Sequence, residues 1–202
     1  MHKANIIAKF GADYRATDLT YKLGIDCRLA DHIAERFSGS VVLETCTGGG
    51  FATIALAKQA KHVFTAEIDA GRMEEAKYNI SIAGLTGKTT FIYKDVFQVD
   101  IASLSLRIDT ALIDPDWADT DEHHEYRFIK STTRPPSDEI LDYMFQYTRN
   151  ITLIQPPFIN RYEFGNLPKH EEERLYLNGS HELYCLHFGD LARTIGKTEF
   201  RI

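Results

Sequence analysis

The sequence has 202 residues, of which 44% are hydrophobic and 26% are charged, and this is the composition of a globular domain long enough to bury a core. No apolar run approaches the roughly 18 residues of a membrane span, so we expect no transmembrane helix and no membrane partner. The formal net charge of −6 argues against an extended nucleic-acid surface, because such a surface usually carries an excess of Lys and Arg.

The N-terminus and the cysteines indicate the cellular compartment that we expect for the protein. The first 15 residues lack the apolar stretch and the small-residue cleavage site of a secretory signal. Cys27, Cys46 and Cys185 are scattered and show no C-x-x-C spacing, which argues against both a disulfide framework and a zinc site. We therefore expect a cytoplasmic protein without a metal, and its oligomeric state is left open.

Residues 1–40 are predicted to form an N-terminal helical segment with interleaved charges. Its clearer helix spans residues 27–37, where Leu29, Ile33 and Phe37 fall on one face. The segment is too short to be a domain, so we expect one domain overall, with the main body at residues 41–202.

From residue 41 onward, strand-like and helix-like stretches alternate. Strands are expected at residues 62–67, 89–93, 108–113 and 150–155, and helices at 70–83, 98–104 and from Ser137 to about 148. The tail predicts a hairpin of residues 174–178 and 182–188 turned by Gly179 and Ser180. This order predicts a Rossmann-like α/β fold, in which a mostly parallel twisted sheet is flanked by helices and followed by a C-terminal antiparallel hairpin.

The stretch at residues 41–57, VVLETCTGGGFATIALA, predicts a strand, a glycine loop and a helix. Three consecutive glycines, Gly48, Gly49 and Gly50, allow a sharp turn and a close approach of a ligand to the backbone. The unpaired amides at the N-terminus of the following helix suit a nucleotide-like ligand.

Acidic residues stand near the ends of three successive strands, where α/β sheets bind their ligands. Glu44 precedes the glycine loop, Glu67 ends the second strand and Asp95 follows the third. Glu67 can accept both ribose hydroxyls of a nucleoside, and Asp95 can accept the exocyclic amine of adenine. One such acid alone is more often a helix cap, but three together indicate a site for adenosine.

A dinucleotide is the rival ligand, and its fingerprint is G-x-G-x-x-G. Thr53 stands where the third glycine is needed. Glu44 would also lie close to a pyrophosphate, whereas a carboxylate suits the ammonium group of a methionine moiety. S-adenosylmethionine is therefore favoured over a dinucleotide.

The fourth strand ends in Asp114-Pro115-Asp116-Trp117, which resembles the [Asn/Asp/Ser]-Pro-Pro-aromatic motif of enzymes that methylate exocyclic amines. Such an amine is a poor nucleophile, because its lone pair is delocalised into the ring. The enzyme therefore needs acceptors for its hydrogens and a flat side chain for the base. Asp114 and the Pro115 carbonyl are the expected acceptors, and Trp117 the stacking partner. The alternative is a loop in which a buried Trp117 anchors the sheet.

The motifs ETCTGGG, TAEID with KYN downstream, KDVF, IDPDW and ELYCLHFGDLAR occur in an order that resembles the RNA cap guanine-N2 methyltransferase family, relatives of trimethylguanosine synthase with a class I methyltransferase fold. DYRATDLTYKLGID and LADHIAERF resemble the family's N-terminal segment, so the likeness covers most of the chain. It implies methyl transfer from S-adenosylmethionine to the N2 amine of a 7-methylguanosine-like base, at an RNA end or in a guanine nucleotide. The implied cofactor-binding residues, with their neighbours, are Glu44, Thr45, Gly48, Gly50, Glu67, Ile68, Asp95 and Val96.

The chain departs from the family pattern at two places. The usual Ser-Pro-Pro-Trp reads Asp-Pro-Asp-Trp, and the N-terminal Ser-Val-Thr-Pro is replaced near residues 23–26. Asp116 would repel phosphate but favour a cationic ring such as 7-methylguanine, which can also stack on Trp117. The long polar connection at residues 116–136 predicts a functional loop, where Arg127, Lys130 and Arg134 are expected to bind an anionic part of the substrate.

Other interpretations remain open. The enzyme could methylate a small molecule or a protein, or the chain could be a cofactor-binding module without catalysis that recruits a partner through residues 116–136 or the terminal hairpin. His123 and His124 lie beside acidic residues that could complete a metal site, but adjacent histidines point in different directions and a solvated loop is favoured. We also expect a solvated face at residues 171–173 and a substrate wall at residues 155–158.

Overall fold

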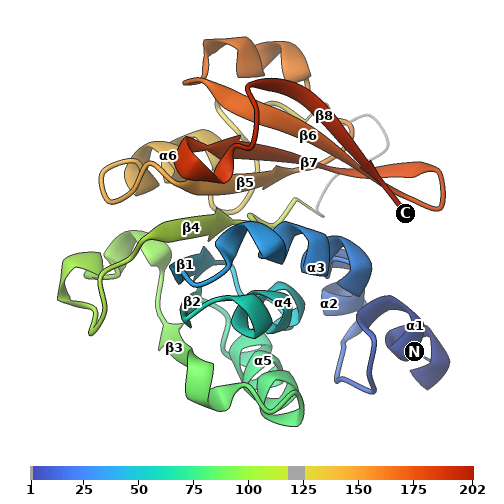
Figure 1. The fold of residues 1–202 in the computed structure, drawn as a ribbon. Coiled ribbons are helices and arrows are strands. Elements are labelled where there is room, and N and C mark those ends of the chain that lie inside the picture. The colour runs from blue at the N-terminus through green and yellow to red at the C-terminus, as the bar shows by residue number, and fades with distance from the viewer. Residues whose placement is uncertain (1, 118–125) are drawn as a thin grey trace. The chain divides into compact units, whose positions relative to one another are not determined.

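The computed structural model describes residues 2–117 and 126–202. It divides the chain into two compact units, Met1–Asp109 and Thr110–Ile202, which are described separately (Figure 1). Within the described residues, no helix combines the length and the apolar character needed to cross a membrane.

The first unit is built on three parallel strands in the order β3-β2-β1. Its helices precede β1 or connect one strand to the next. Its elements are α1 (Lys3–Phe10), α2 (Asp18–Leu23), α3 (Cys27–Ala34), β1 (Val41–Thr45), α4 (Phe51–Gln59), β2 (His62–Glu67), α5 (Ala70–Ile82) and β3 (Thr89–Tyr93), with short 3-10 turns at Glu35–Phe37, Thr86–Lys88, Val96–Gln98 and Ile101–Ser103.

The burial of apolar side chains accounts for several of these elements. Every residue of β1 is buried, as expected for a parallel strand covered on both faces. Leu29, Ile33 and Phe37 are at most 2% exposed, which confirms the predicted apolar face of α3 and its 3-10 extension. Figure 1 shows α3 beside α4, and these helices pack together. β2 and β3 have the predicted bounds, but the predicted helix at residues 98–104 is replaced by 3-10 turns.

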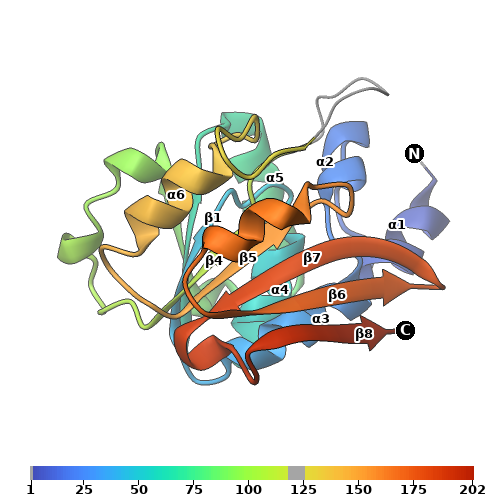
Figure 2. The same ribbon diagram turned by 90° about the horizontal axis from the view of Figure 1, so that it is seen from above.

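In the described part of the second unit, five strands lie in the order β4-β5-β7-β6-β8. β4 pairs with β5 and β6 with β8 in parallel, whereas β7 is antiparallel to both of its neighbours. Figure 2 shows β7, β6 and β8 side by side, with β8 outermost. Its elements are β4 (Thr110–Ile113), α6 (Ser137–Met144), β5 (Ile151–Gln155), the 3-10 helix η5 (Arg161–Asn166), β6 (His170–Leu177), β7 (Ser180–Phe188), the 3-10 turn Gly189–Leu191 and β8 (Gly196–Arg201).

The C-terminal hairpin confirms the predicted architecture and corrects its details. The turn lies at Asn178 and Gly179, whose φ angles of 51° and 85° suit a two-residue type I′ turn, so Ser180 already belongs to β7. Strand β8 was not predicted. Ser137 is the first residue of α6, as predicted, but the helix ends at Met144 rather than near residue 148. The buried Ser137 hydroxyl bonds to Thr133 Oγ1 at 2.8 Å and Gln155 Nε2 at 2.9 Å.

The prediction of a solvated acidic face at residues 171–173 was wrong. These three glutamates lie in β6, between β7 and β8, and are 2–7% exposed. Each carboxylate has a partner: Glu171 accepts from Thr198 Oγ1 at 2.7 Å, Glu172 pairs with Arg161 at 2.6 Å, and Glu173 contacts His187 Nε2 at 3.0 Å. Buried carboxylates need such partners because an isolated charge away from water is costly.

Candidate cofactor and acceptor sites

The glycine loop connects β1 to α4 and is packed against α5. Gly50 precedes α4 with a φ of 80°, and a Cβ at this position would lie 3.1 Å from the Ala76 Cα. A side chain therefore fits neither the backbone conformation nor the space. The Gly50 N–H donates to the Thr47 carbonyl at 2.9 Å. The loop is a fixed turn at the carboxyl end of β1, as the sequence predicts.

Glu44 lies under this loop and is 1% exposed. Its Oε2 accepts hydrogen bonds from Thr53 Oγ1 at 2.5 Å and Thr65 Oγ1 at 2.6 Å. Burial raises the pKa of Glu44 to about 7, although the two hydroxyls oppose that rise. Thr53 stands where the dinucleotide-binding motif G-x-G-x-x-G has its third glycine. Its hydroxyl instead donates a hydrogen bond to the Glu44 carboxylate. Contact of Glu44 with a cofactor stays a prediction.

Glu67 joins the end of β2 to the glycine loop. Its Oε2 accepts the Gly48 N–H at 2.9 Å, and its Oε1 accepts the N–H groups of Ile68 at 3.0 Å and Asp69 at 2.9 Å. An ionised carboxylate offers about four acceptor positions, so roughly one is left for a ribose hydroxyl. The neighbouring Ile68 is 65% exposed at the same strand end, and its contact with a cofactor base stays a prediction.

Asp95 lies two residues beyond β3, close to the end of β2. The Lys94 N–H donates to the Glu67 carbonyl at 3.0 Å, which ties the two strand ends together. Asp95 Oδ1 accepts the Phe97 N–H at 3.0 Å and caps the turn Val96–Gln98. This carboxylate is both a cap and a candidate ligand for an adenine amine, because its Oδ2 has no hydrogen-bond partner among the described residues.

Asn79 of α5 is a supporting residue that the site prediction did not include, although KYN belongs to the motifs of the resemblance. It is fully buried. Its side chain accepts the Arg15 N–H at 2.8 Å and donates to the carbonyls of Arg15 and Gly49, both at 2.9 Å. One amide thereby connects the N-terminal segment, the glycine loop and α5.

The acceptor motif follows β4 in the second unit. Trp117 is partly buried, and its ring meets that of Tyr126 edge-on, with centroids 6.2 Å apart. The Tyr126 hydroxyl donates to the Trp117 carbonyl at 2.5 Å. Asp116 and Arg134 exchange two backbone hydrogen bonds, at 3.0 and 2.9 Å. The motif is therefore held by residues of the long connection, and its role in acceptor binding stays a prediction.

The three predicted anion-binding residues lie in different surroundings. Arg127 forms an ion pair with Glu163 of η5 at 2.6 Å, so part of its charge is compensated within the chain. The side chains of Lys130 and Arg134 are exposed, and the Lys130 backbone N–H donates to Asp138 Oδ2 at 2.7 Å. Their roles in substrate binding stay predictions.

The candidate metal cluster around His123 and His124 lies outside the described residues, as do Asp119, Asp121 and Glu122. Among residues 2–117 and 126–202, no group of three or more His, Cys, Asp or Glu side chains is placed to hold a metal ion.

Comparison with known proteins identifies the family. Residues 39–162, more than half of the chain, match the family described as RNA cap guanine-N2 methyltransferase. The chain belongs to the RNA cap guanine-N2 methyltransferase family. S-adenosylmethionine is the cofactor of this family.

Solved structures agree with the fold. A protein assigned as a methyltransferase from Porphyromonas gingivalis W83 superposes with a TM-score of 0.74 at 14% identity, over 95% of this chain and 48% of its own. The chain therefore spans about half the length of that protein. TrmK from M. capricolum, solved with S-adenosylhomocysteine, has a TM-score of 0.55 at 14% identity, over 83% of this chain and 69% of its own. These likenesses confirm the Rossmann-like methyltransferase fold.

The strand ends of the first unit fit the cofactor of this family. The loop at Gly48 and Gly50 presents backbone without side chains, Glu67 keeps acceptor capacity for a hydroxyl, and Asp95 keeps one oxygen for an amine. When bound, S-adenosylmethionine supplies an electrophilic methyl group on a sulfonium.

Proposed function

We propose that the protein transfers a methyl group from S-adenosylmethionine to the exocyclic N2 amine of a guanine, at an RNA end or in a cap-like nucleotide. The observation that carries this proposal is the Asp114–Trp117 turn at the end of β4, which a family match covers and which Tyr126 and Arg134 hold in place.

Asp114 and the Pro115 carbonyl act as acceptors for the amine hydrogens. They orient the nitrogen lone pair toward the methyl carbon, so positioning supplies most of the catalysis and no covalent intermediate is needed. Formation of the bond between nitrogen and methyl would break the bond between methyl and sulfur and leave the nitrogen cationic. The Asp114 carboxylate would stabilise that charge and accept the proton that the nitrogen then loses. Asp114 is partly exposed, so it can be reached by a substrate.

Trp117 supplies the flat surface for the base. A 7-methylguanine ring carries a positive charge, which makes stacking on an indole favourable by about 0.5–2 kcal/mol. Asp116, which stands where the family has proline, adds a negative charge next to this surface and favours a cationic ring over a neutral one. Arg127, Lys130 and Arg134 are the side chains proposed for the phosphates of the same substrate.

The test follows from the fact that Trp117 is the only tryptophan. Titration of the protein with 7-methylguanosine nucleotides should quench its fluorescence. Incorporation of labelled methyl groups into fractionated RNA, protein and metabolites then identifies the acceptor. Cofactor binding without quenching, and with label in protein or small molecules, would overturn the guanine assignment; cofactor binding with no label in any fraction would indicate a module without catalysis.

A substitution at Trp117 separates the two sites. We expect Trp117→Ala to weaken binding of 7-methylguanosine nucleotides at least tenfold in calorimetry, because the stacking surface is lost, and to leave the cofactor affinity unchanged. Trp117→Phe keeps a flat ring and should retain part of the binding. Tyr147→Ala, at a tyrosine in the turn after α6, is the control for the loss of an exposed aromatic side chain. Equal nucleotide affinity in Trp117→Ala and the control would contradict the stacking role.

A further inference from the structure

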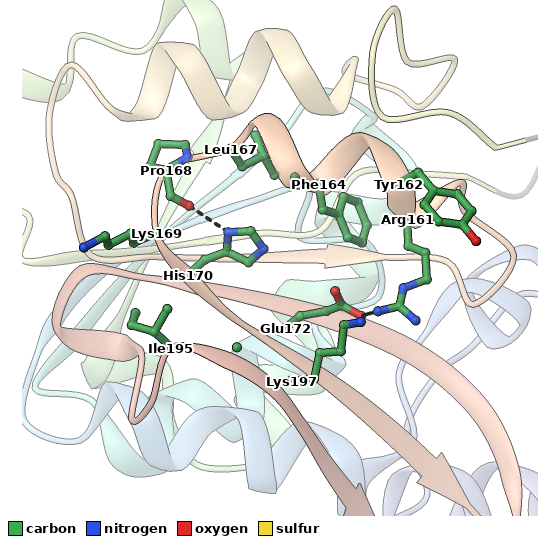
Figure 3. Close-up of a pocket in the computed structure, with 12 residues that line it drawn as sticks. Arg161, Tyr162, Phe164, Leu167, Pro168, Lys169, His170, Glu172, Ile195 and Lys197 are labelled. Carbon is green, nitrogen blue, oxygen red and sulfur yellow. Dashed lines mark hydrogen bonds and ion pairs between the residues drawn. The ribbon is translucent and has the colours of Figure 1, made fainter.

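A cavity with a volume of about 550 Å³ lies within the second unit. Its walls come from η5, from the connection between η5 and β6, from β6 itself and from the start of β8 (Figure 3). This volume is in the range of sites that bind small molecules or single nucleotides. None of the residues predicted to bind cofactor or acceptor lines it.

The charges of the cavity favour an anion. Lys169 and Lys197 are exposed, and neither has an ion pair or a side-chain hydrogen bond among the described residues. Arg161 is paired with the buried Glu172 at 2.6 Å. The lining thus contains three cationic side chains and one carboxylate, in a chain whose formal net charge is −6. In Figure 3 Lys197 lies at the end near Arg161 and Glu172, and Lys169 at the opposite end.

The cavity also offers surfaces for a planar ring. Tyr162 of η5 is 92% exposed, and Ile195 before β8 is 62% exposed. The His170 ring lies between the two charged ends in Figure 3, where its Nδ1 is 2.7 Å from the Pro168 carbonyl oxygen, a hydrogen bond that fixes the ring. Proteins that bind single-stranded nucleic acid without reading its sequence combine a cationic groove with aromatic side chains on which bases stack.

η5 connects this cavity to the acceptor segment, by which we mean the Asp114–Trp117 turn and the residues from Tyr126 onward that hold it. Glu163, the residue after Tyr162, accepts the backbone N–H groups of Phe128 and Ile129, both at 2.8 Å. At the start of η5, the Asn160 N–H donates to the carbonyl of Tyr126 at 2.8 Å, the residue that holds Trp117. Contacts within one unit therefore lead from the cavity wall to the stacking tryptophan.

We propose that this cavity binds a nucleoside phosphate, with the base on Tyr162 and phosphates at Lys169 and Lys197. An internal nucleotide of a chain carries a phosphate on each side, so lysines at the two ends suit a second nucleotide of an RNA acceptor better than a free mononucleotide. The choice of RNA as the source rests on the proposed function, whereas the site itself rests on the cavity and its charges.

The test uses the full chain and a labelled single-stranded RNA hexanucleotide without guanine, which leaves the Trp117 site out of the measurement. In fluorescence anisotropy, the double variant Lys169→Ala/Lys197→Ala should bind about tenfold more weakly. Its slope of log affinity against log salt should be smaller by about 1.4, since each neutralised phosphate of a single strand contributes about 0.7. Tyr162→Ala should lower the affinity about tenfold through lost stacking.

The controls are Lys61→Ala, at an exposed lysine before β2, and Tyr147→Ala. Both should bind the hexanucleotide like the wild type. Calorimetry with S-adenosylmethionine and Trp117 quenching by 7-methylguanosine nucleotides test the proposed function separately, and both should be unchanged in the cavity variants.

Binding measurements with uridine monophosphate distinguish a free nucleotide from an RNA chain as the ligand of the cavity. Binding of the monophosphate alone, lost in the double variant, would assign the site to free nucleotides. Hexanucleotide binding that is lost in the double variant supports the RNA chain. The inference is overturned if the wild type binds neither ligand, or if the cavity variants bind both as tightly as the controls; in either case quenching at Trp117 would still decide the proposed function.

Discussion

At the scale of single residues, Glu44 shows how burial changes chemistry. The folded protein holds this carboxyl at 1% exposure between two threonine hydroxyls, and burial raises its pKa from 4.5 to about 7. Between pH 4.5 and about pH 7, Glu44 is ionised in the unfolded chain but still protonated in the folded protein. The free energy of unfolding therefore falls as pH rises through this window and levels off above it.

Glu44→Gln tests this linkage, because the amide oxygen can still accept both hydroxyls but cannot ionise. We expect the wild type to lose about 2 kcal/mol of stability relative to Glu44→Gln between pH 5 and pH 8, an order of magnitude set by the size of the pKa shift. Urea denaturation of both proteins at the two pH values measures it. Parallel pH profiles would mean that Glu44 is already ionised in the folded state.

The same residue makes cofactor binding depend on pH. The ammonium group of S-adenosylmethionine near Glu44 would favour the ionised carboxylate, so affinity should rise several-fold from pH 6.0 to 7.4. Glu44→Gln should remove this dependence. Calorimetric titrations at both pH values decide the matter, and an equal rise in both proteins would assign Glu44 a structural role only.

At the scale of elements, α5 organises the cofactor site through Asn79. Its amide joins the backbone of Arg15 to the Gly49 carbonyl, and the Thr17 N–H donates to Glu75 Oε2 at 3.2 Å. The N-terminal segment is thus attached to the helix that also packs against Gly50. This segment therefore contributes to the shape of the glycine loop although it supplies none of the predicted cofactor-binding residues.

Asn79→Ala leaves three backbone groups without their partner, which should cost about 1–3 kcal/mol of stability. We expect cofactor affinity to fall about tenfold and amide exchange of residues 13–17 and 47–50 to become faster. Hydrogen exchange and calorimetry measure the two effects, with Asn166→Ala at an exposed asparagine as the control. Unchanged exchange in residues 47–50 would show that the loop is held without Asn79.

The sequence predicts these elements unequally, for physical reasons. β2 was predicted with its bounds because a buried parallel strand is a short apolar run between turns. β3 is an edge strand with only one buried residue, and its threonines and aromatic residues favour a strand. β8 was missed because GKTEFR is polar, as an edge strand can be, and because its pairing with β6 depends on distant residues. The buried glutamates of β6 were predicted as solvated because their partners come from other elements, so no local pattern shows them.

At the scale of the whole molecule, the predicted cofactor-binding residues fall in Met1–Asp109 and the acceptor motif in Thr110–Ile202. The placement of Glu67 and Asp95 at neighbouring strand ends could be predicted, because parallel strands bring their ends to one edge of a sheet; their contact with the cofactor stays a prediction. The supporting roles of Tyr126 and Glu163 could not be predicted. Tyr126 lies in the long connection and Glu163 in a 3-10 helix distant in sequence, so no local pattern indicates their contacts with the acceptor segment.

Hydrogen exchange of the full chain with different ligands tests how the two units share the function. S-adenosylhomocysteine alone should slow exchange at residues 45–50, 67–69 and 95–98, where the predicted cofactor-binding backbone lies. Further addition of a 7-methylguanosine nucleotide should slow exchange at residues 114–117 and 126–134, with little change at residues 61–63, the opposite end of β2. Protection by the cofactor product at residues 161–172 instead would place the cofactor in the cavity of the second unit, and would overturn both the cofactor assignment and the separate role of that cavity.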